Sequence, residues 1–231
     1  MLYYSPFDIY YVTLVVPAVL FALICQWRVS STFKKYSKVQ TRRGITGEQA
    51  AKKVCSYGDT RHTLVKQVQG HLTDHFNPKT NEIGLSESVY SQSTVAAVGV
   101  AAHEAGHASQ FAQDYGPMRL RHILLPVTNV ASMLAVPLVL IGFWMEFLML
   151  VNVGILFFGV AFFFQVVTLP VEFNASRRAL RVLESGGMLD EDELRGAKKV
   201  LTAAAMTYVA AMAVSLAQLL RFMMIARGRR R

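Results

Sequence analysis

The chain has 231 residues, of which 53% are apolar, and a formal net charge of +9 at pH 7. None of its 24 lysines and arginines lies between His122 and Ser176, and many crowd just outside the long apolar runs. That distribution is typical of a membrane protein facing anionic lipid headgroups. A nucleic-acid partner would require a basic face with aromatic or motif support, which the sequence lacks.

The first predicted element is a membrane anchor. The run Ile9 to Trp27 is almost entirely apolar and long enough to cross a bilayer. A cleaved signal peptide is the alternative, but it requires positive charge before the apolar core, where this chain has only Asp8. Basic residues follow the run at Arg28, Lys34, Lys35, Lys38, Arg42 and Arg43. The positive-inside rule therefore predicts an outside N-terminus and a cytoplasmic region after the anchor.

The region after the anchor begins with a predicted helix capped by Thr46. Further on, the segment His71 to Ser86 contains Asn77-Pro78 followed by polar residues, which is turn chemistry. We therefore expect a small hairpin or a pair of strands there. Within it, Asn81 to Leu85 is strand-like and is expected to align an extended peptide substrate by added-strand pairing, with Gly84 letting the substrate backbone approach closely. The alternative is an ordinary hairpin edge.

A second helix is predicted to begin at Ser93 or Thr94 and to end before Gly116-Pro117. Its first turns, Val95 to Ala102, contain only valine, alanine and glycine, so this helix can pack closely against its neighbours.

An HExxH motif, His103-Glu104-Ala105-Gly106-His107, lies inside this second helix. Histidines four residues apart share one helix face, so both imidazoles can reach one cation. Glu104 points to the same opening, where a carboxylate can take a proton from water activated by the metal. The pattern alone is moderately specific. With these ligand types it predicts a catalytic zinc site.

Two further apolar stretches, Ile123 to Met145 and Phe147 to Val171, are separated by the single charge of Glu146. Such close spacing predicts a transmembrane hairpin with Glu146 at the outer turn. Because a hairpin returns the chain to the side it left, Glu172 is expected on the same side as the HExxH motif.

A catalytic zinc site has three protein ligands and water, so a third ligand is needed. Glu172 is the leading candidate, since it follows the hairpin directly and begins a segment with a helical pattern. His71 and His75 are the rivals. The Asn77-Pro78 turn argues against a long helix there, so we expect these histidines at the surface or in a substrate cleft.

The last apolar run, Leu201 to Leu220, is uncharged but contains several polar residues. We favour a fourth span. The alternative is a helix lying at the membrane interface, because a span would leave the basic tail, Arg227 to Arg231, outside.

Together these elements predict a mainly α-helical membrane protein with a zincin-like HExxH helix, a small β-hairpin or sheet element and about four transmembrane helices. In chain order we expect an N-terminal anchor (1–27), a cytoplasmic zincin-like part (28–122), a transmembrane hairpin (123–171), a third-ligand helix with a cytoplasmic segment (172–199) and a C-terminal helix with a basic tail (200–231).

Three blocks of sequence resemble the YugP-like family of bacterial membrane zinc metallopeptidases. They are Ser93 to Ala108, Leu72 to His75 and Leu169 to Arg178, and the resemblance runs from about Thr46 to Tyr208. The order of HExxH, two spans and an E-x-x-A glutamate also resembles the more distant HtpX-like membrane proteases.

The resemblance implies one zinc per chain with a gluzincin-like ligand set, His103, His107 and Glu172, and Glu104 as the general base. One position departs from the HtpX-like pattern, which usually has an aspartate four residues after the ligand glutamate. Here that residue is Ser176, which can still hydrogen-bond a ligand histidine, but with less electrostatic support.

The expected function is a membrane-embedded zinc endopeptidase in a bacterial plasma membrane, with its site on the cytoplasmic side. Its substrates would be proteins or peptides, membrane proteins among them. Arg177 and His75 are the candidates for stabilising the oxyanion. The alternatives are a non-catalytic zinc scaffold or chaperone, and a small transporter that uses Glu172 and Gln165.

Overall fold

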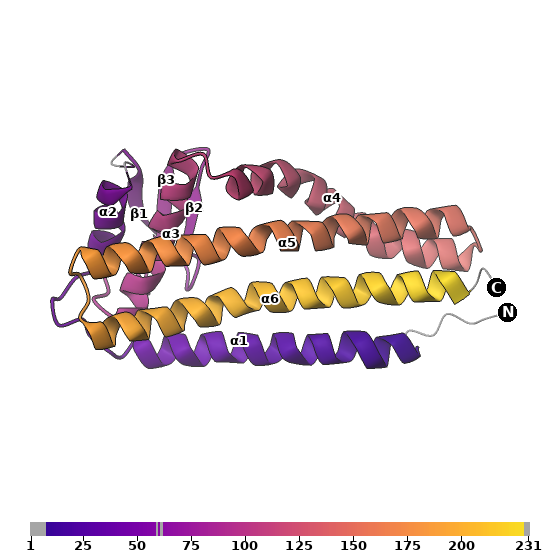
Figure 1. Ribbon diagram of the computed structural model, residues 1–231, viewed down its shortest axis with the longest axis horizontal. Coiled ribbons are helices and arrows are strands. Elements are labelled where there is room, and N and C mark those ends of the chain that lie inside the picture. Colours follow the sequence, from indigo (N-terminus) through magenta and orange to yellow (C-terminus); the bar gives the residue numbers. More distant parts are fainter. Residues whose placement is uncertain (1–7, 59, 61, 229–231) are drawn as a thin grey trace. The chain divides into compact units, whose positions relative to one another are not determined.

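The structure, a computed structural model, describes residues 8–58, 60 and 62–228 of the chain. Its elements in chain order are η1 (Tyr11–Val15), α1 (Val16–Tyr36), α2 (Gly47–Tyr57), β1 (Leu64–Val68), β2 (His75–Asn77), β3 (Glu82–Ser86), α3 (Val95–Ala112), α4 (Gly116–Trp144), α5 (Leu148–Ser185) and α6 (Glu191–Gly228) (Figure 1). Helices dominate, and the strands form one small sheet. The predicted fold class is confirmed.

The chain divides into two compact units. The first, which we call the span unit, comprises Met1–Gln26, Leu120–Leu169 and Thr207–Arg231. The second, the sheet unit, comprises Trp27–Arg119 and Pro170–Met206.

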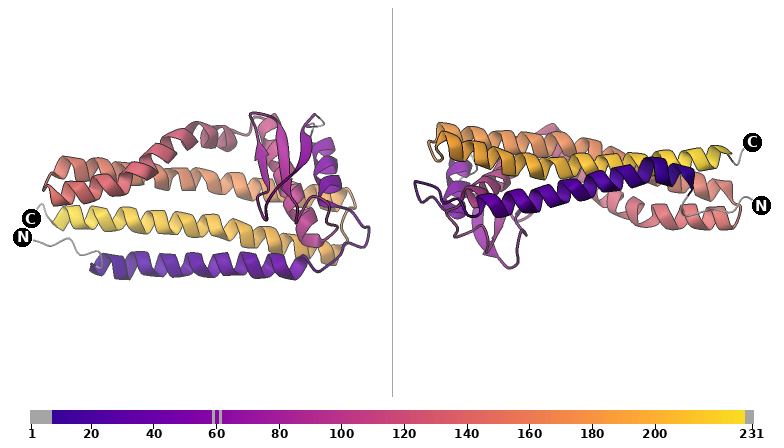
Figure 2. Two further views of the ribbon diagram at one scale, coloured as in Figure 1. Left: turned by 180° about the vertical axis from the view of Figure 1, so that it is seen from behind. Right: turned by 90° about the horizontal axis from the view of Figure 1, so that it is seen from below.

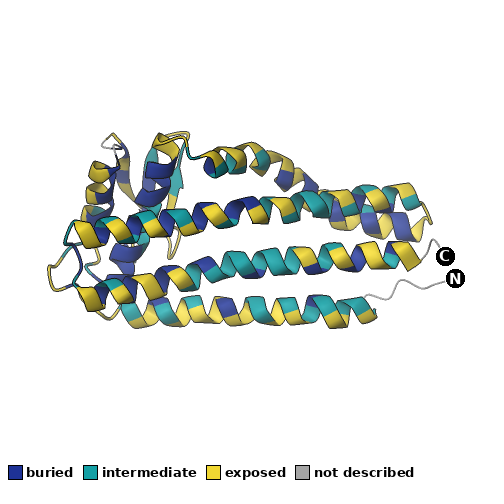
Figure 3. Cartoon of the chain, viewed as in Figure 1, coloured by how far each residue is buried: buried dark blue, intermediate teal, exposed yellow. Residues whose placement is uncertain are grey.

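Four helical stretches have the length and apolar composition to cross a membrane. They are Tyr11–Tyr36, Gly116–Trp144, Leu148–Ser185 and Glu191–Gly228. Few residues in their apolar windows are buried within the protein, and Figure 3 shows exposed and half-buried residues along α1 and α6. Apolar side chains left uncovered in this way favour a lipid environment. The fourth stretch includes Leu201 to Leu220, in agreement with the favoured prediction.

Two glycines bring α4 and α5 close together in the span unit. A methyl group on Gly142 would lie 2.7 Å from the backbone nitrogen of Val151, and one on Gly154 would lie 2.5 Å from Val139 Cγ2. Such close approach of backbones is a general means of packing helices in lipid. The two helices are joined by a tight turn in which Glu146 has a φ of +56°, as expected for a short connection.

An ion pair joins the beginning and the end of the span unit. The Arg221 side chain donates through Nε and Nη2 to Asp8 Oδ2, at 2.9 and 2.7 Å. The guanidinium also lies over the ring of Tyr11, 4.9 Å from its centroid. Arg221 is only 4% exposed, so its end of this ion pair is shielded from solvent.

The sheet of the sheet unit has the strand order β1-β3-β2, with β1 parallel and β2 antiparallel to β3 (Figure 2). The antiparallel pair is the predicted hairpin, whereas β1 was not anticipated. The added strand makes β3 central, because β1 pairs along all of β3 and β2 pairs with Glu82 to Gly84. The prediction that Asn81 to Leu85 binds substrate by strand addition is therefore wrong for Glu82 to Gly84, which are already paired on both sides.

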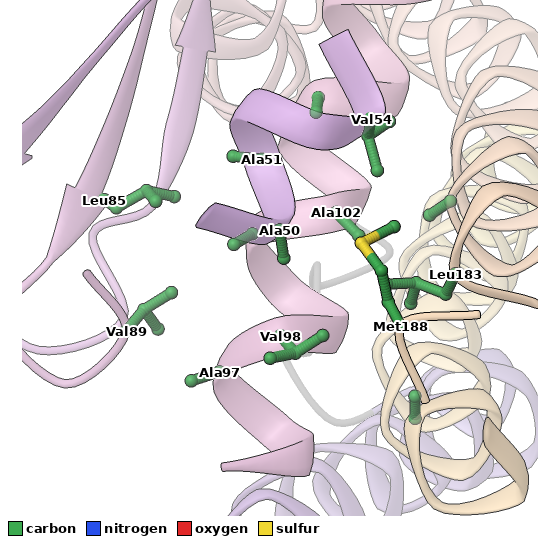
Figure 4. Close-up of a cluster of buried hydrophobic side chains, with 14 of the residues drawn as sticks. Ala50, Ala51, Val54, Leu85, Val89, Ala97, Val98, Ala102, Leu183 and Met188 are labelled. Atoms are coloured by element: carbon green, nitrogen blue, oxygen red, sulfur yellow. The ribbon is translucent and has the colours of Figure 1, made fainter. Parts of the chain in front are cut away.

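The core of the sheet unit lies around α2 and α3. The two helices begin with side-chain caps, a capping box between Thr46 and Gln49 for α2 and Thr94 for α3. The alanines and valines of α3 other than Val100 and Ala112 are almost fully buried, as its small-residue composition predicted. Figure 4 shows Leu183 and Met188 turned towards Val54 of α2 and Ala102 of α3.

One helix, α5, continues from the second apolar run through Glu172 to Ser185. The sequence predicted a new helix beginning at Glu172, and the structure corrects this. Glu172 lies in the middle of a continuous helix, past Pro170. Its position is fixed by helical backbone on both sides and does not depend on a loop.

Candidate metal centre

Three potential metal ligands converge in the sheet unit. His103 and His107 come from α3 and Glu172 from α5, and one ligand atom of each lies within 4.8 Å of the others. Glu172 Oε2 is 3.2 Å from His103 Nε2 and 3.5 Å from His107 Nε2. Glu172 is 1% exposed and His107 7% exposed, so the cluster is largely shielded from solvent.

The spacing of these atoms fits a zinc ion. Nitrogen and oxygen ligands bind zinc at about 2.0–2.1 Å, so two corners of a tetrahedron around it lie roughly 3.3 Å apart. The two separations between imidazole nitrogen and carboxylate oxygen bracket that value. Two imidazoles and a carboxylate are also a donor set that zinc accepts. The residues therefore fit the metal that the sequence implied.

A glutamine orients the second histidine. Gln110 Oε1 lies 3.0 Å from His107 Nδ1, while Gln110 Nε2 donates to the Val171 carbonyl and to Asn174 Oδ1. Since Nε2 is fully engaged as a donor, the atom facing His107 is the acceptor oxygen. His107 must therefore carry its proton on Nδ1, which leaves a lone pair on Nε2 for a metal.

This network extends outwards along α5. Asn174 Oδ1 also accepts a hydrogen bond from Arg178 Nε at 2.7 Å, and Arg178 Nη1 donates to Gln113 Oε1. Gln110, Asn174 and Arg178 were not among the site residues that the sequence predicted. Their spacing along the helices could have indicated them. Gln110 lies one helical turn beyond His107, and Asn174 and Arg178 lie four residues apart, shortly after Glu172.

The first histidine is oriented by Ser176. His103 Nδ1 lies 3.0 Å from Ser176 Oγ, one turn beyond Glu172 on the same face of α5. The serine at the position usually held by aspartate in HtpX-like proteins thus makes the contact that was anticipated. A neutral hydroxyl gives the imidazole less electrostatic support than a carboxylate would.

A glycine in the motif allows the two ligand helices to meet. A methyl group on Gly106 would lie 2.6 Å from the carbonyl oxygen of Ala175, closer than real side chains approach. The backbone of α3 therefore lies directly against that of α5 between the histidines and the glutamate. This contact explains why one of the two variable positions of the HExxH motif is glycine here.

Glu104 lies between the two histidines in sequence and is partly exposed. Among the described residues, its side chain has no hydrogen bond or ion pair. Burial raises the pKa of Glu104 to about 7, opposed by the nearby charge of His103. The charges of Asp74 and His75 also act on this carboxyl, so both side chains lie in its surroundings. A bound cation would lower the pKa again.

A small cluster on the sheet holds His75 in place. Asp74 accepts hydrogen bonds from the backbone nitrogen and the hydroxyl of Ser86, and burial raises the pKa of Asp74. His75 Nδ1 lies 2.9 Å from the carbonyl oxygen of Thr73, which can only accept. The imidazole covers Gly84, where a methyl group would lie 2.7 Å from His75 Cε1. Gly84 therefore makes room for His75, and the predicted close approach of a substrate backbone is wrong.

The remaining candidates lie elsewhere. The ring of His71 packs against Phe33 with centroids 5.9 Å apart, and His71 is exposed. Neither His71 nor His75 joins the ligand cluster among the described residues. Arg177 is exposed and lines a groove between α5 and α6. It is five residues from Glu172, so it projects about 140° around the helix from the ligand.

The fold and the site define a mainly helical membrane protein with a three-residue centre able to hold a metal. Residues 11–227 match the model of the family described as "Putative neutral zinc metallopeptidase", and the chain belongs to that family. It is also 44% identical over 215 residues to a protein of Bacillus subtilis (strain 168) named "Putative membrane protease YugP". The alignment covers 93% of this chain and 96% of that protein. No solved structure matches.

Proposed function

We propose that this protein is a membrane zinc endopeptidase in which His103, His107 and Glu172 bind one zinc ion per chain and Glu104 is the general base. The observation that carries the proposal is the convergence of two imidazole nitrogens and a carboxylate oxygen next to a glutamate without a hydrogen-bonded partner among the described residues. A closed structural zinc site would have a fourth protein ligand and no need for such a glutamate.

The proposed chemistry is hydrolysis of a peptide bond. Bound zinc is a Lewis acid that lowers the pKa of water towards ~7 and polarises a carbonyl group. Glu104 accepts the proton of the attacking water and delivers it to the departing amine. Gln110 and Ser176 hold the two histidines, and the buried surroundings of Glu172 strengthen every charge interaction within the site.

His75 is a better candidate than Arg177 for stabilising the oxyanion. Its Nδ1 proton is held by Thr73, so Nε2 donates a hydrogen bond only when the ring is protonated. The side chain of His75 lies in the surroundings of the proposed base, Glu104. Arg177, by contrast, projects away from the face of α5 that carries Glu172 and Ser176.

The edge of β2 is the proposed docking line for an extended peptide. Within the described sheet, β1 and β2 are the outer strands, and β2 packs on α3 through Phe76 and Phe111, whose ring centroids are 5.9 Å apart. A peptide added along β2 would therefore pass beside the metal helix.

The proposed role of His75 in stabilising the oxyanion can be tested by substitution. Replacement of His75 by Gln is expected to lower kcat with little effect on zinc content.

Plasma-membrane location with a cytoplasmic site is part of this proposal. It is supported by the basic residues that follow α1 within the sheet unit, the unit that also holds the ligands. The name of the Bacillus subtilis relative likewise describes a membrane protease. A tag inserted after residue 43 would test the orientation in sealed inverted vesicles, whose outer face is the cytoplasmic one. Added protease should digest the tag, and protection of the tag would contradict a cytoplasmic site.

The central experiment measures zinc content and casein hydrolysis on the same detergent-purified samples. Wild type and Glu104→Gln should each hold about one zinc per chain, and only wild type should be active. Glu172→Ala should lose zinc. Glu87→Ala, which removes an exposed glutamate far from the motif in sequence, is the control and should match wild type.

Each contrary result has a defined meaning. Full zinc in Glu172→Ala would remove Glu172 from the ligand set. Hydrolysis by Glu104→Gln at the wild-type rate would exclude Glu104 as the base. Zinc without hydrolysis in wild type, tested on casein and on membrane-protein substrates, would favour the scaffold.

A further inference from the structure

A groove of about 580 Å³ lies between the parts of α5 and α6 that belong to the sheet unit. Its floor is apolar, with Leu180, Leu194 and Leu201 among the lining residues. Arg177, Arg181 and Lys198 line it as well. The groove thus combines apolar and cationic surfaces, a combination that the metal site does not require.

The positive charge in this groove is largely uncompensated. Arg177, Arg181 and Lys198 are exposed, and among the described residues none of the three has a side-chain hydrogen bond or ion pair. The fourth basic residue, Arg195, is paired with Glu191. Glu184 is then the remaining acidic residue in the lining. The unpaired cations outnumber it, so the groove favours an anion.

Two of the three unpaired cationic residues lie near the depth of lipid headgroups. Arg177 is five residues beyond Glu172, where the apolar run of α5 ends, a rise of about 8 Å along the helix. Lys198 precedes the apolar run that begins at Leu201 by three residues, about 4.5 Å. The headgroup layer on each side of a bilayer is roughly 5–7 Å thick. Lys198 therefore lies within that layer and Arg177 at its outer edge. Arg181, one turn further along α5, lies roughly 13.5 Å from Glu172 and reaches a phosphate there only by extending its side chain towards the bilayer.

We propose that this groove binds one anionic phospholipid. The phosphate would be held by Arg177 and Arg181 from α5 and Lys198 from α6, and an acyl chain would leave past Leu201 along the apolar part of the helices. Basic pockets between membrane helices recognise anionic lipids by this combination of charge and apolar surface. The proposal does not depend on peptidase activity.

A peptide is a weaker match to the same groove. Extended peptides are recognised through backbone hydrogen bonds to a strand edge, but the groove is lined by residues of two helices, whose backbone groups are already paired. A free phosphate ion shares the charge requirement but leaves the apolar floor without a role.

Native mass spectrometry of the full chain in detergent can test this proposal. Phosphatidylglycerol and phosphatidylcholine with the same acyl chains would be titrated separately, and the fraction of lipid-bound protein measured. The test variant is Arg181→Gln with Lys198→Gln. The matched control, Lys34→Gln with Lys199→Gln, removes two exposed lysines near the apolar runs that do not line the groove.

Wild type and the control should bind phosphatidylglycerol roughly tenfold more tightly than phosphatidylcholine, and the test variant should lose most of that preference. Equal affinity for the two lipids, or an equal loss in the control, would overturn the proposal. If inorganic phosphate displaces the lipid at the same concentrations at which it binds the lipid-free protein, the groove is assigned to free phosphate. If the test variant binds lipid as wild type does but has a raised KM for an acidic peptide, the groove is assigned to substrate binding. Thermal unfolding of every variant establishes that it is folded.

Discussion

Gln110 Oε1 lies 3.0 Å from Nδ1 of His107, three residues earlier on the same helix. Because the amide nitrogen of Gln110 is committed to the Val171 carbonyl and to Asn174, this contact fixes which nitrogen of His107 is free. The protein thus prepares one ring for a metal before any metal binds. The same amide links the two helices that supply the ligands, so ligand orientation and helix packing depend on one side chain.

Replacement of Gln110 by Met tests this relationship. Methionine has a similar volume but provides no strong acceptor, so His107 can adopt the other tautomer and rotate. Loss of such an outer partner costs about 10–100-fold in metal affinity. Competition with a zinc chelator would measure the change. Gln67→Met, an exposed position on β1, should leave affinity unchanged. Wild-type affinity in Gln110→Met would show that the amide does not orient the ring.

Gly106→Ala is expected to separate the two ligand helices. The new methyl group would meet the Ala175 carbonyl oxygen at 2.6 Å, and overpacking of this kind costs about 1–3 kcal/mol. Zinc affinity should fall at the same time, because α5 carries Glu172. Equilibrium unfolding and chelator competition on the same samples would measure both effects.

Gly99→Ala is the matched control on α3. Its methyl group would lie 3.4 Å from the Ala197 side chain, an ordinary contact. Alanine also raises helix propensity by about 1 kcal/mol relative to glycine. The control should therefore keep its zinc and be at least as stable as wild type. Equal zinc loss in both variants would mean that close packing at Gly106 has no special role.

Asp74 gives a prediction about pH. Burial raises its pKa in the folded protein above the ordinary 3.8, and the hydrogen bonds from Ser86 oppose this rise only in part. The folded state therefore holds the proton more tightly, and the associated stability is lost as pH rises through the folded-state pKa. Asn keeps acceptors for Ser86 without the charge. Asp74→Asn should be at least as stable as wild type at pH 8 in thermal unfolding, and its advantage should shrink towards pH 4.

Asp74→Ala separates the charge from the hydrogen bonds. It removes both contacts to Ser86, so it should be less stable than wild type at pH 8. If Asp74→Asn were as destabilised as Asp74→Ala at pH 8, the ionised carboxylate itself would be required, and the pH argument would fail.

The pair of Asp8 and Arg221 predicts strong coupling between two distant positions. Removing one partner of a buried ion pair costs about 3–5 kcal/mol, because the remaining charge stays buried and loses that compensation. Asp8→Asn and Arg221→Met should each lower the stability of the protein in detergent. The double variant should lose less than the sum of the two changes. Strict additivity in thermal or denaturant unfolding would contradict the proposed dependence.

Much of the architecture was predictable because membrane spans and helix caps leave local signals. The apolar runs, the cap at Thr46 and the small-residue composition of Val95 to Ala102 all correspond to elements in the structure. The location of the HExxH helix followed from its spacing alone. The fourth span was harder to predict, because its polar residues and basic tail conflicted with its length.

Non-local pairing was the part that sequence patterns could not supply. Nothing in Leu64 to Val68 specifies a parallel partner, so β1 was missed and β3 was mistaken for an edge. The continuity of α5 through Pro170 was also missed, because a proline and a charge usually mark a helix boundary. The side chains that orient the ligands, Gln110 above all, belong to helices that meet only after folding.

The contact between Asp8 and Arg221 also has a consequence for biosynthesis. The two residues are 213 positions apart, so the carboxylate enters the membrane region long before its guanidinium partner is made. During that interval Asp8 must remain hydrated or find a temporary partner. The span unit can therefore close only once Thr207–Arg231 has been made, and a chain interrupted before residue 221 would leave Asp8 without this partner.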